Sequence, residues 1–372
     1  MGSGGGHGAF LRKDANLSDV ENVEESQKNL ELIDDRFNTF LGEDAGEKLK
    51  EPGSTGARNT AVGTSALKKN TTGSRNTALG GGALQGNITG NSNTALGTSA
   101  LQSNTTGNSN TAIGDGALLS NTTGIDNVGI GLAPLEVNKT GSRNIAIGRE
   151  ALEQNTTNDN IAIGYNALRN NITGNDNIAI GTASLEFNIT GRRNIAIGKV
   201  ALNQNRPGND NTGIGYKALF NNNIGYGNTG VGSEALTGNI TGNDNTAVGS
   251  SALRGDGPSE NFTGNRNVAV GKLALVNIKT GNDNTAIGFN TYTTSNDVSN
   301  SIIIGKDGVG KGSHSTVIGN SLSNSFYIGT SNDSVKQRRS GTGSITGYPL
   351  YIGTDGQLFV DTAGIVTTFG DV

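Results

Sequence analysis

The chain has 372 residues, including 59 Gly and no Trp or Cys, and only 32% of its residues are hydrophobic. This composition excludes a disulfide frame and a Cys nucleophile, and it is poor in the residues that fill an ordinary globular core. The net charge of −4 is too small to favour nucleic acid or an anionic membrane as a partner.

The first 50 residues differ in character from the rest of the chain. Ser18 and Glu21 form a capping-box pattern ahead of an amphipathic stretch, so we expect one or two short helices within residues 18–41. Phe37, Phe40 and Leu41 are expected to lie on the apolar side of that helical segment. We predict that residues 1–50 cap the fold, attach it to a partner, or do both. The candidate attachment residues are Phe10, Leu11, Leu17, Val20 and Leu30.

A 17-residue repeat dominates residues 51–305. The pattern Asn, a β-branched residue, Ala or Gly, an aliphatic residue and then Gly occurs fourteen times, from Asn59 to Asn284, and eleven of the thirteen intervals have this same length. The interval that ends at Asn160 is one residue shorter, and the interval that ends at Asn267 is lengthened by the insertion at 254–262. A period of this length is typical of a solenoid, in which each unit buries its apolar residues only against its neighbours.

The tetrad has the alternation of a short β-strand. The β-branched and aliphatic positions, such as Thr60 and Val62, share one face of the strand, and the small residue between them, such as Ala61, points to the other face. Only a small group is admitted there, so another backbone or a tight axis must come close. We therefore expect the strand to be buried on both faces.

A second anchor follows each strand. Four residues after the repeat Gly comes Leu in thirteen of fourteen copies, with Tyr292 as the exception, and then a turn such as Asn-Thr-Thr-Gly at 70–73. In that turn we expect Gly to supply a positive φ. The predicted fold is an all-β solenoid or β-roll with stacked aliphatic, Ala and Asn columns. The predicted core residues are Val62, Leu67, Ile113, Leu118, Ile147, Leu152, Ile197, Leu202 and Ile287.

The last segment, 306–372, loses the period but keeps β-like stretches, and it is richer in aromatic and basic residues. We predict a β-rich tip that contacts a receptor. The candidate receptor-facing residues are Phe326, Tyr327, Arg338, Arg339, Tyr348 and Tyr351.

Residues 10–32 resemble a segment common in bacteriophage tail fibres. That segment reads apolar-Leu-x-Lys, Asn-Leu-Ser-Asp, a variable stretch, Ala-Arg-x-Asn-Leu and a final Leu. The matching residues are Leu11, Lys13, Asn16 to Asp19, Asn29, Leu30 and Leu32, whereas Ser26 and Gln27 stand where Ala and Arg are usual. The resemblance implies that the N-terminus docks on a tail or baseplate protein.

The repeats resemble those of phage and contractile-injection-system fibres, and they are similar to the head repeats of trimeric autotransporter adhesins. The resemblance implies a left-handed β-roll and a homotrimer. The adhesin repeats are usually shorter, near the step that this chain shows only from Gly305 to Gly319.

Chemistry-bearing clusters are scarce. The only His residues are His7 and His314, so no His triad or metal cluster is expected, and we expect no cofactor. Several Asp residues recur just before the repeat Asn. A paired-carboxylate glycosidase would need two acids at a set separation in a groove, and a solvated edge is the simpler interpretation. These residues are Asp126, Asp159, Asp176, Asp210, Asp244 and Asp283.

The sequence therefore predicts a non-enzymatic structural protein. We expect the shaft of a homotrimeric viral tail fibre, located in the virion and extracellular once released, that attaches to a host surface glycan or outer-membrane component. Neither nucleic acid nor membrane insertion is expected. A bacterial trimeric surface adhesin, or a fragment of one, is the alternative, and a tailspike depolymerase is less favoured.

Overall fold

The computed structural model describes residues 36–255 and 261–320, together with the backbones of four short strands further on. It is an all-β parallel solenoid of about 16 turns with repeats of about 17 residues and almost no helix, which confirms the predicted fold class. The chain divides into two units, 1–192 and 193–372, which are described separately.

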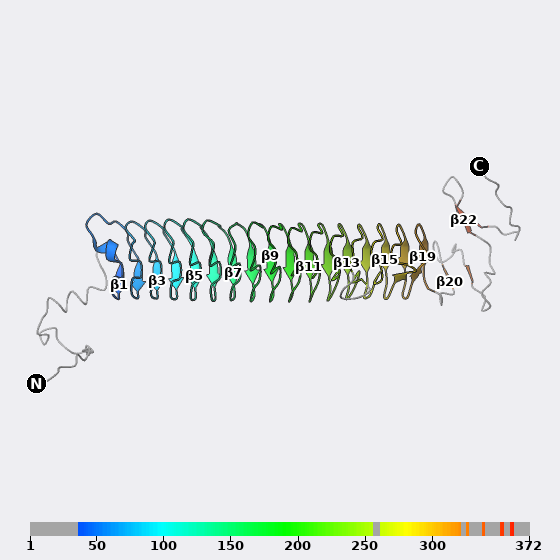
Figure 1. Ribbon diagram of the computed structural model, residues 1–372, viewed down its shortest axis with the longest axis horizontal. Coiled ribbons are helices and arrows are strands. Elements are labelled where there is room, and N and C mark those ends of the chain that lie inside the picture. The colour runs from blue at the N-terminus through cyan, green and yellow to red at the C-terminus, as the bar shows by residue number, and fades with distance from the viewer. Residues whose placement is uncertain are drawn as a thin grey trace, which may run out of the picture. The chain divides into compact units, whose positions relative to one another are not determined.

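Each coil of the first unit contributes one three-residue strand to a parallel sheet (Figure 1). Consecutive strands pair in register, so that Ala61 of β2 lies beside Ala78 of β3. The strands are β1 (Thr39–Leu41), β2 (Thr60–Val62), β3 (Thr77–Leu79), β4 (Thr94–Leu96), β5 (Thr111–Ile113), β6 (Val128–Ile130), β7 (Ile145–Ile147), β8 (Ile161–Ile163) and β9 (Ile178–Ile180).

The second unit repeats this arrangement. Its sheet consists of β10 (Ile195–Ile197), β11 (Thr212–Ile214), β12 (Thr229–Val231), β13 (Thr246–Val248), β14 (Val268–Val270), β15 (Thr285–Ile287), β17 (Ile302–Ile304) and β19 (Thr316–Ile318). A second parallel pair joins β16 (Tyr292–Thr293) to β18 (Val309–Gly310). Two antiparallel pairs follow, β20 (Ser325–Phe326) with β21 (Gln337–Arg338) and β22 (Leu350–Ile352) with β23 (Leu358–Val360).

The solenoid extends beyond the predicted shaft at both ends. Phe40 and Leu41 belong to strand β1, which pairs with β2, so the helix expected up to residue 41 is wrong for its last residues. The repeat motif is present there, with Phe40 in the place of the usual Ala, and its Asn38 precedes Asn59 by a longer interval than the usual one. The extra length forms a turn of 3-10 helix, η2 (Glu47–Lys50), which buries Leu49. The rest of the predicted helix, 18–35, lies outside the described residues.

The interior of each coil contains small and polar side chains as well as Leu. In the second coil Ala61, Ala66 and Leu67 are fully buried, together with Asn59 and Asn70. The strand is therefore buried on its Ala face only, and its other face points outward. The expectation of burial on both faces fails within one chain, because the group that comes close to the small position is the buried Leu of the preceding coil. A Cβ on Gly129, for example, would lie 3.3 Å from Leu118 Cγ. This narrow interior explains why so few hydrophobic residues suffice.

Two ladders of buried Asn run through the interior. In the first, formed by the Asn that precedes each strand, both the backbone N–H and Nδ2 of Asn110 donate to Oδ1 of Asn93, at 2.9 and 3.1 Å. Nδ2 of Asn110 also donates to the carbonyl of Gly124 at 2.8 Å. The amide thus bonds both the preceding coil and the closing turn of its own coil, and it leaves no buried donor unsatisfied.

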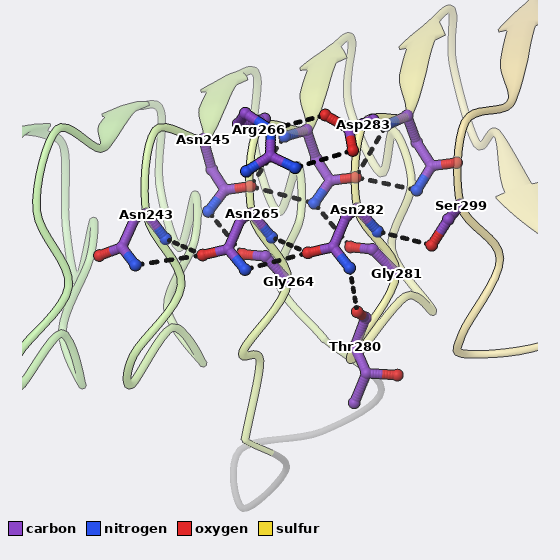
Figure 2. A network of polar contacts seen from close by, with 12 residues as sticks. Asn243, Asn245, Gly264, Asn265, Arg266, Thr280, Gly281, Asn282, Asp283 and Ser299 are labelled. Carbon is purple, nitrogen blue, oxygen red and sulfur yellow. Dashed lines mark hydrogen bonds and ion pairs between the residues drawn. The ribbon is translucent and has the colours of Figure 1, made fainter.

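The second ladder is formed by the Asn that opens each turn. Asn104 Nδ2 donates to Asn87 Oδ1 at 2.7 Å and to the carbonyl of Gly107 at 3.0 Å. Figure 2 shows the first ladder in the second unit beside a third, more exposed one formed by Asn243, Asn265 and Asn282.

The glycines serve two different needs. Gly97, the repeat Gly after a strand, has φ of 139°, which favours Gly. The turn glycines lack a positive φ, contrary to expectation. They are required for space, because a Cβ on Gly73 would collide with Asn70 Oδ1 and the carbonyl of Gly90.

Several residues with side chains also adopt the left-handed conformation in every coil. In the second coil these are Arg58, Ser65 and Leu67, with φ of 58°, 58° and 51°. A left-handed residue other than Gly costs about 1–2 kcal/mol. The cost is borne because burial of the Leu and the inter-coil hydrogen bonds depend on these corners.

Besides the first and last coils, two coils depart from the 17-residue length, and each interrupts the second ladder. The shorter coil, which ends at Asn160, lacks its turn Gly, and the carbonyl of Thr157 accepts the bond from Asn144 Nδ2 in its place. In the longer coil, which ends at Asn267, Phe262 occupies the place of the turn Asn and is fully buried. Asn138 Oδ1 and Asn239 Oδ1, on the preceding coils, are left without a partner.

We predict that Asn110→Ala destabilises the protein by about 3–5 kcal/mol, because it leaves several buried donors and acceptors unsatisfied. Chemical denaturation measures the decrease in the free energy of unfolding. We also expect faster hydrogen exchange at the backbone N–H of Asn127, because this group donates to Asn110 Oδ1 at 3.0 Å. Asn108→Ala is the matched control, since its amide belongs to the exposed ladder, and it should cost less than about 1 kcal/mol. Equal effects of the two substitutions would contradict a ladder-dependent fold.

Candidate interaction surface

The outward face of the sheet carries an aliphatic row, which we call the outward row. It consists of the first and third residues of each strand, and from β2 to β9 in the first unit these are all Thr, Val, Leu or Ile. Several of the third positions are markedly exposed, with Leu79 at 45% and Ile180 at 37%, and the others are half-buried. In the second unit Val248 is 39% exposed and Ile287 is 43% exposed.

The outward row has the properties of a surface that is covered by protein. Large exposed apolar patches are rare on soluble monomers and mark sites of association. No charged residue interrupts the row from β2 to β15, although charged residues are the usual protection of exposed β-structure against association. The in-register pairing of the strands places equivalent side chains next to one another, so each unit presents a continuous stripe.

The predicted core residues fall on both sides of the coil wall. Leu67, Leu118, Leu152 and Leu202 are fully buried in the interior. The strand residues of that set lie on the outward row, where Ile147 is 36%, Ile197 is 37% and Ile287 is 43% exposed, and Val62 and Ile113 are half-buried. The alternation in the sequence separates these two sets but does not indicate which one faces inward.

The predicted attachment residues, Phe10, Leu11, Leu17, Val20 and Leu30, lie outside the described residues. Of the predicted receptor-facing residues, Phe326 and Arg338 lie in the antiparallel pair β20–β21, and Tyr351 lies in β22. Tyr327, Arg339 and Tyr348 lie outside the described residues.

The recurring Asp residues belong to a column of left-handed residues that precede the ladder Asn. Arg occupies the same column in other coils, and three of these Arg residues pair with the Asp of the next coil. Arg266 Nε and Nη2 donate to Asp283 Oδ1 and Oδ2 at 2.7 and 2.9 Å (Figure 2). Arg143 and Asp159 form the same two-pronged pair at 2.6 and 2.8 Å, and so do Arg193 and Asp210 at the same distances.

These ion pairs determine the titration of the carboxyls. The hydrogen bond from Arg143 lowers the pKa of Asp159 below its ordinary value, and Arg193 lowers the pKa of Asp210 in the same way. A glycosidase needs one carboxyl with a raised pKa to act as the general acid. These carboxyls are shifted in the opposite direction.

Within residues 36–255 and 261–320, no group of three or more His, Asp or Glu residues is arranged to hold a metal ion. His314 occupies the left-handed column in the last coil, with its Nδ1 at 3.0 Å from Nδ2 of Asn300. In the part of the chain that the structure describes, no helix has the length and apolarity needed to span a bilayer.

The lowered pKa of Asp210 predicts a pH-dependent contribution to stability. The Arg193–Asp210 pair stabilises the coil above the unfolded pKa of about 3.9, and this contribution is lost as the pH falls through the lower folded pKa. We expect Asp210→Asn to be less stable than the wild type at pH 7 and to converge with it in strong acid. Denaturation midpoints measured from pH 7 to pH 2 test this, and a difference that does not change with pH would rule out the ion pair as its cause.

No protein-family model matches the chain, and a search of curated proteins finds no similar sequence.

Proposed function

We propose that this chain forms the rigid shaft of a homotrimeric fibre, most simply a viral tail fibre that attaches the particle to a host cell. The observation that carries the proposal is the uncharged aliphatic outward row. It is exposed on an isolated chain and continues from strand to strand, whereas other exposed apolar side chains, such as Ile172 and Tyr226, lie outside the strands.

Other copies of the same chain are well suited to pack against the outward row. A row of equivalent Thr, Val, Leu and Ile residues on one chain has the same coil spacing as the row on another, so parallel copies can match along their length. Closed cyclic symmetry around a common axis would bury all copies of the row at once, without leaving an open edge. The number three comes from the resemblance of the repeats to those of trimeric fibres and adhesins.

The two terminal segments have the composition expected for docking on a particle and for binding a receptor. The tail-fibre-like segment at 10–32 precedes the coils, and the segment richer in aromatic and basic residues follows them. In this proposal the N-terminal part docks on a tail or baseplate protein, and the C-terminal part contacts a host glycan or outer-membrane component. The coils act as a spacer, because a continuous ladder of inter-coil hydrogen bonds resists bending.

A bacterial trimeric surface adhesin, or a fragment of one, would use the same outward row and is the alternative. A tailspike depolymerase has less support, since the recurring carboxyls that pair with Arg have lowered pKa values.

We expect light scattering to give a mass of about 114 kDa, three times the 38.0 kDa of one chain, and negative stain to show a rod. Ile180→Asp should weaken this association by placing a charge in the buried row. Thr182→Asp is the matched control, because Thr182 lies just beyond the strand and outside the row. A stable 38.0 kDa particle would contradict the trimer.

Fluorescently labelled protein should bind the surface of susceptible cells within a panel of bacterial strains. Replacing Arg338, Arg339 and Tyr351 by Ser should abolish the binding and leave the mass of the particle unchanged. Release of reducing sugar ends from capsule would instead support a depolymerase, and binding that survives these substitutions would place the receptor contact elsewhere.

A further inference from the structure

The left-handed column changes character in the first three coils. Phe37, Arg58 and Arg75 occupy it there, with φ of 62°, 58° and 60°. Backbone hydrogen bonds join these three positions from coil to coil. The Arg58 N–H donates to the carbonyl of Arg36, and the Arg75 N–H donates to the carbonyl of Ala57, both at 2.9 Å. Phe37 is 71% exposed, and both Arg side chains are also exposed.

Arg58 and Arg75 therefore lie on adjacent coils, whose strands are about 4.8 Å apart, and the column holds no carboxylate before Asp126. The next two positions are Ser92 and Ser109. Among the described residues, neither Arg58 nor Arg75 makes a side-chain hydrogen bond or an ion pair. Like charges so placed repel each other, and an external anion would relieve that repulsion.

The three internal Arg–Asp pairs show what this column does with an Arg. In each, the guanidinium reaches one coil onward and donates two parallel bonds to a carboxylate, as Arg143 does to Asp159. The equivalent place one coil beyond Arg75 is above Ser92, which is too short to fill it. The backbone at Arg75 thus has the same conformation as at the paired Arg residues, but no carboxylate of the next coil accepts its two hydrogen bonds.

A hollow of about 330 Å³ opens beside these residues. It is lined by Arg36, Phe37, Ala57, Arg58, Ser74 and Arg75. The wall formed by Arg36 is held in place, since its guanidinium donates to the carbonyl and hydroxyl of Ser54 at 2.7 and 2.9 Å and to the carbonyl of Leu49. The site therefore combines cationic groups with an exposed aromatic ring.

We propose that the Phe37–Arg58–Arg75 column binds an acidic peptide segment of a partner protein. A carboxylate of that segment accepts the two-pronged bond from Arg75 above Ser92, a second carboxylate pairs with Arg58, and an apolar side chain covers Phe37. This assignment rests on the proposed function, in which the N-terminal end of the fibre meets a tail or baseplate protein, and it names the chemistry of that contact.

The test is calorimetric titration of the full chain with a synthetic peptide of Glu and Leu residues, at low and at high salt. We expect the double substitution Arg58→Ser with Arg75→Ser to lower the affinity about tenfold, and high salt to weaken binding to the wild type. Arg266→Ser is the matched control, because that Arg is already paired with Asp283, and it should leave the affinity unchanged.

A second pair of variants keeps both Arg residues. Ser92→Asp supplies an internal carboxylate to Arg75, as Asp159 does to Arg143, and should also lower the affinity, whereas Ser92→Asn should not. All substituted side chains are partly or fully exposed, so circular dichroism and the particle mass should match those of the wild type.

Three results would overturn the proposal. Binding that survives both the double Arg substitution and Ser92→Asp would place the peptide elsewhere. Equal displacement of the peptide by inorganic phosphate at the same charge concentration would indicate a general anion site. Tighter binding after Glu24, Glu25 and Glu31 are changed to Gln would show that the chain's own acidic segment occupies the column. None of these results alters the particle mass or the binding to cells, so failure here is distinguishable from failure of the fibre proposal.

Discussion

The structure depends on a hydrogen bond that crosses from one coil to the next inside the solenoid. Each ladder Asn offers one carbonyl oxygen, which accepts both the backbone N–H and the side-chain amide of the following Asn, and its own amide closes a turn. Placed in a dry interior, such groups are costly unless they are all satisfied. The ladder therefore enforces in-register stacking, since a slipped coil would bury unpaired amides.

The requirement for satisfied ladders explains features that otherwise look unfavourable. Most coils keep three non-Gly residues in the left-handed conformation, including a fully buried Leu. The turn glycines lie so close to the ladder that a Cβ would strike an Asn oxygen or the next coil's carbonyl. The coils that end at Asn160 and Asn267 show the tolerance of the arrangement, because each leaves an Asn oxygen without a partner on the preceding coil, but the first ladder continues through both.

The same architecture sorts side chains between the interior and the two candidate surfaces. Ala, Leu and Asn fill the narrow interior. The larger β-branched and aliphatic residues of the strands therefore remain outside and form the row on which the fibre proposal depends. The left-handed corner beside the ladder forms a second column, where Arg and Asp pair across coils. At the first coils that column holds two Arg residues and a Phe, and its unpaired charge motivates the proposed peptide site.

The sequence by itself determined the repeat, the solenoid class and the buried Leu column, because a strict 17-residue period allows only stacked coils and the Leu recurs at one place in it. It also indicated the Asn column. The first coil was missed, since Phe40 disguises the motif and η2 lengthens the spacing from Asn38 to Asn59. Only the tertiary structure decided that Ala61 faces inward and Val62 outward. A period of two separates the faces of a strand without orienting them, and the orientation comes from corners such as Ser65 and Leu67, whose left-handed backbone turns the chain toward its Ala side. The pairing of Arg with Asp, and the isolation of Arg58 and Arg75, likewise emerge only when residues of successive coils are brought side by side.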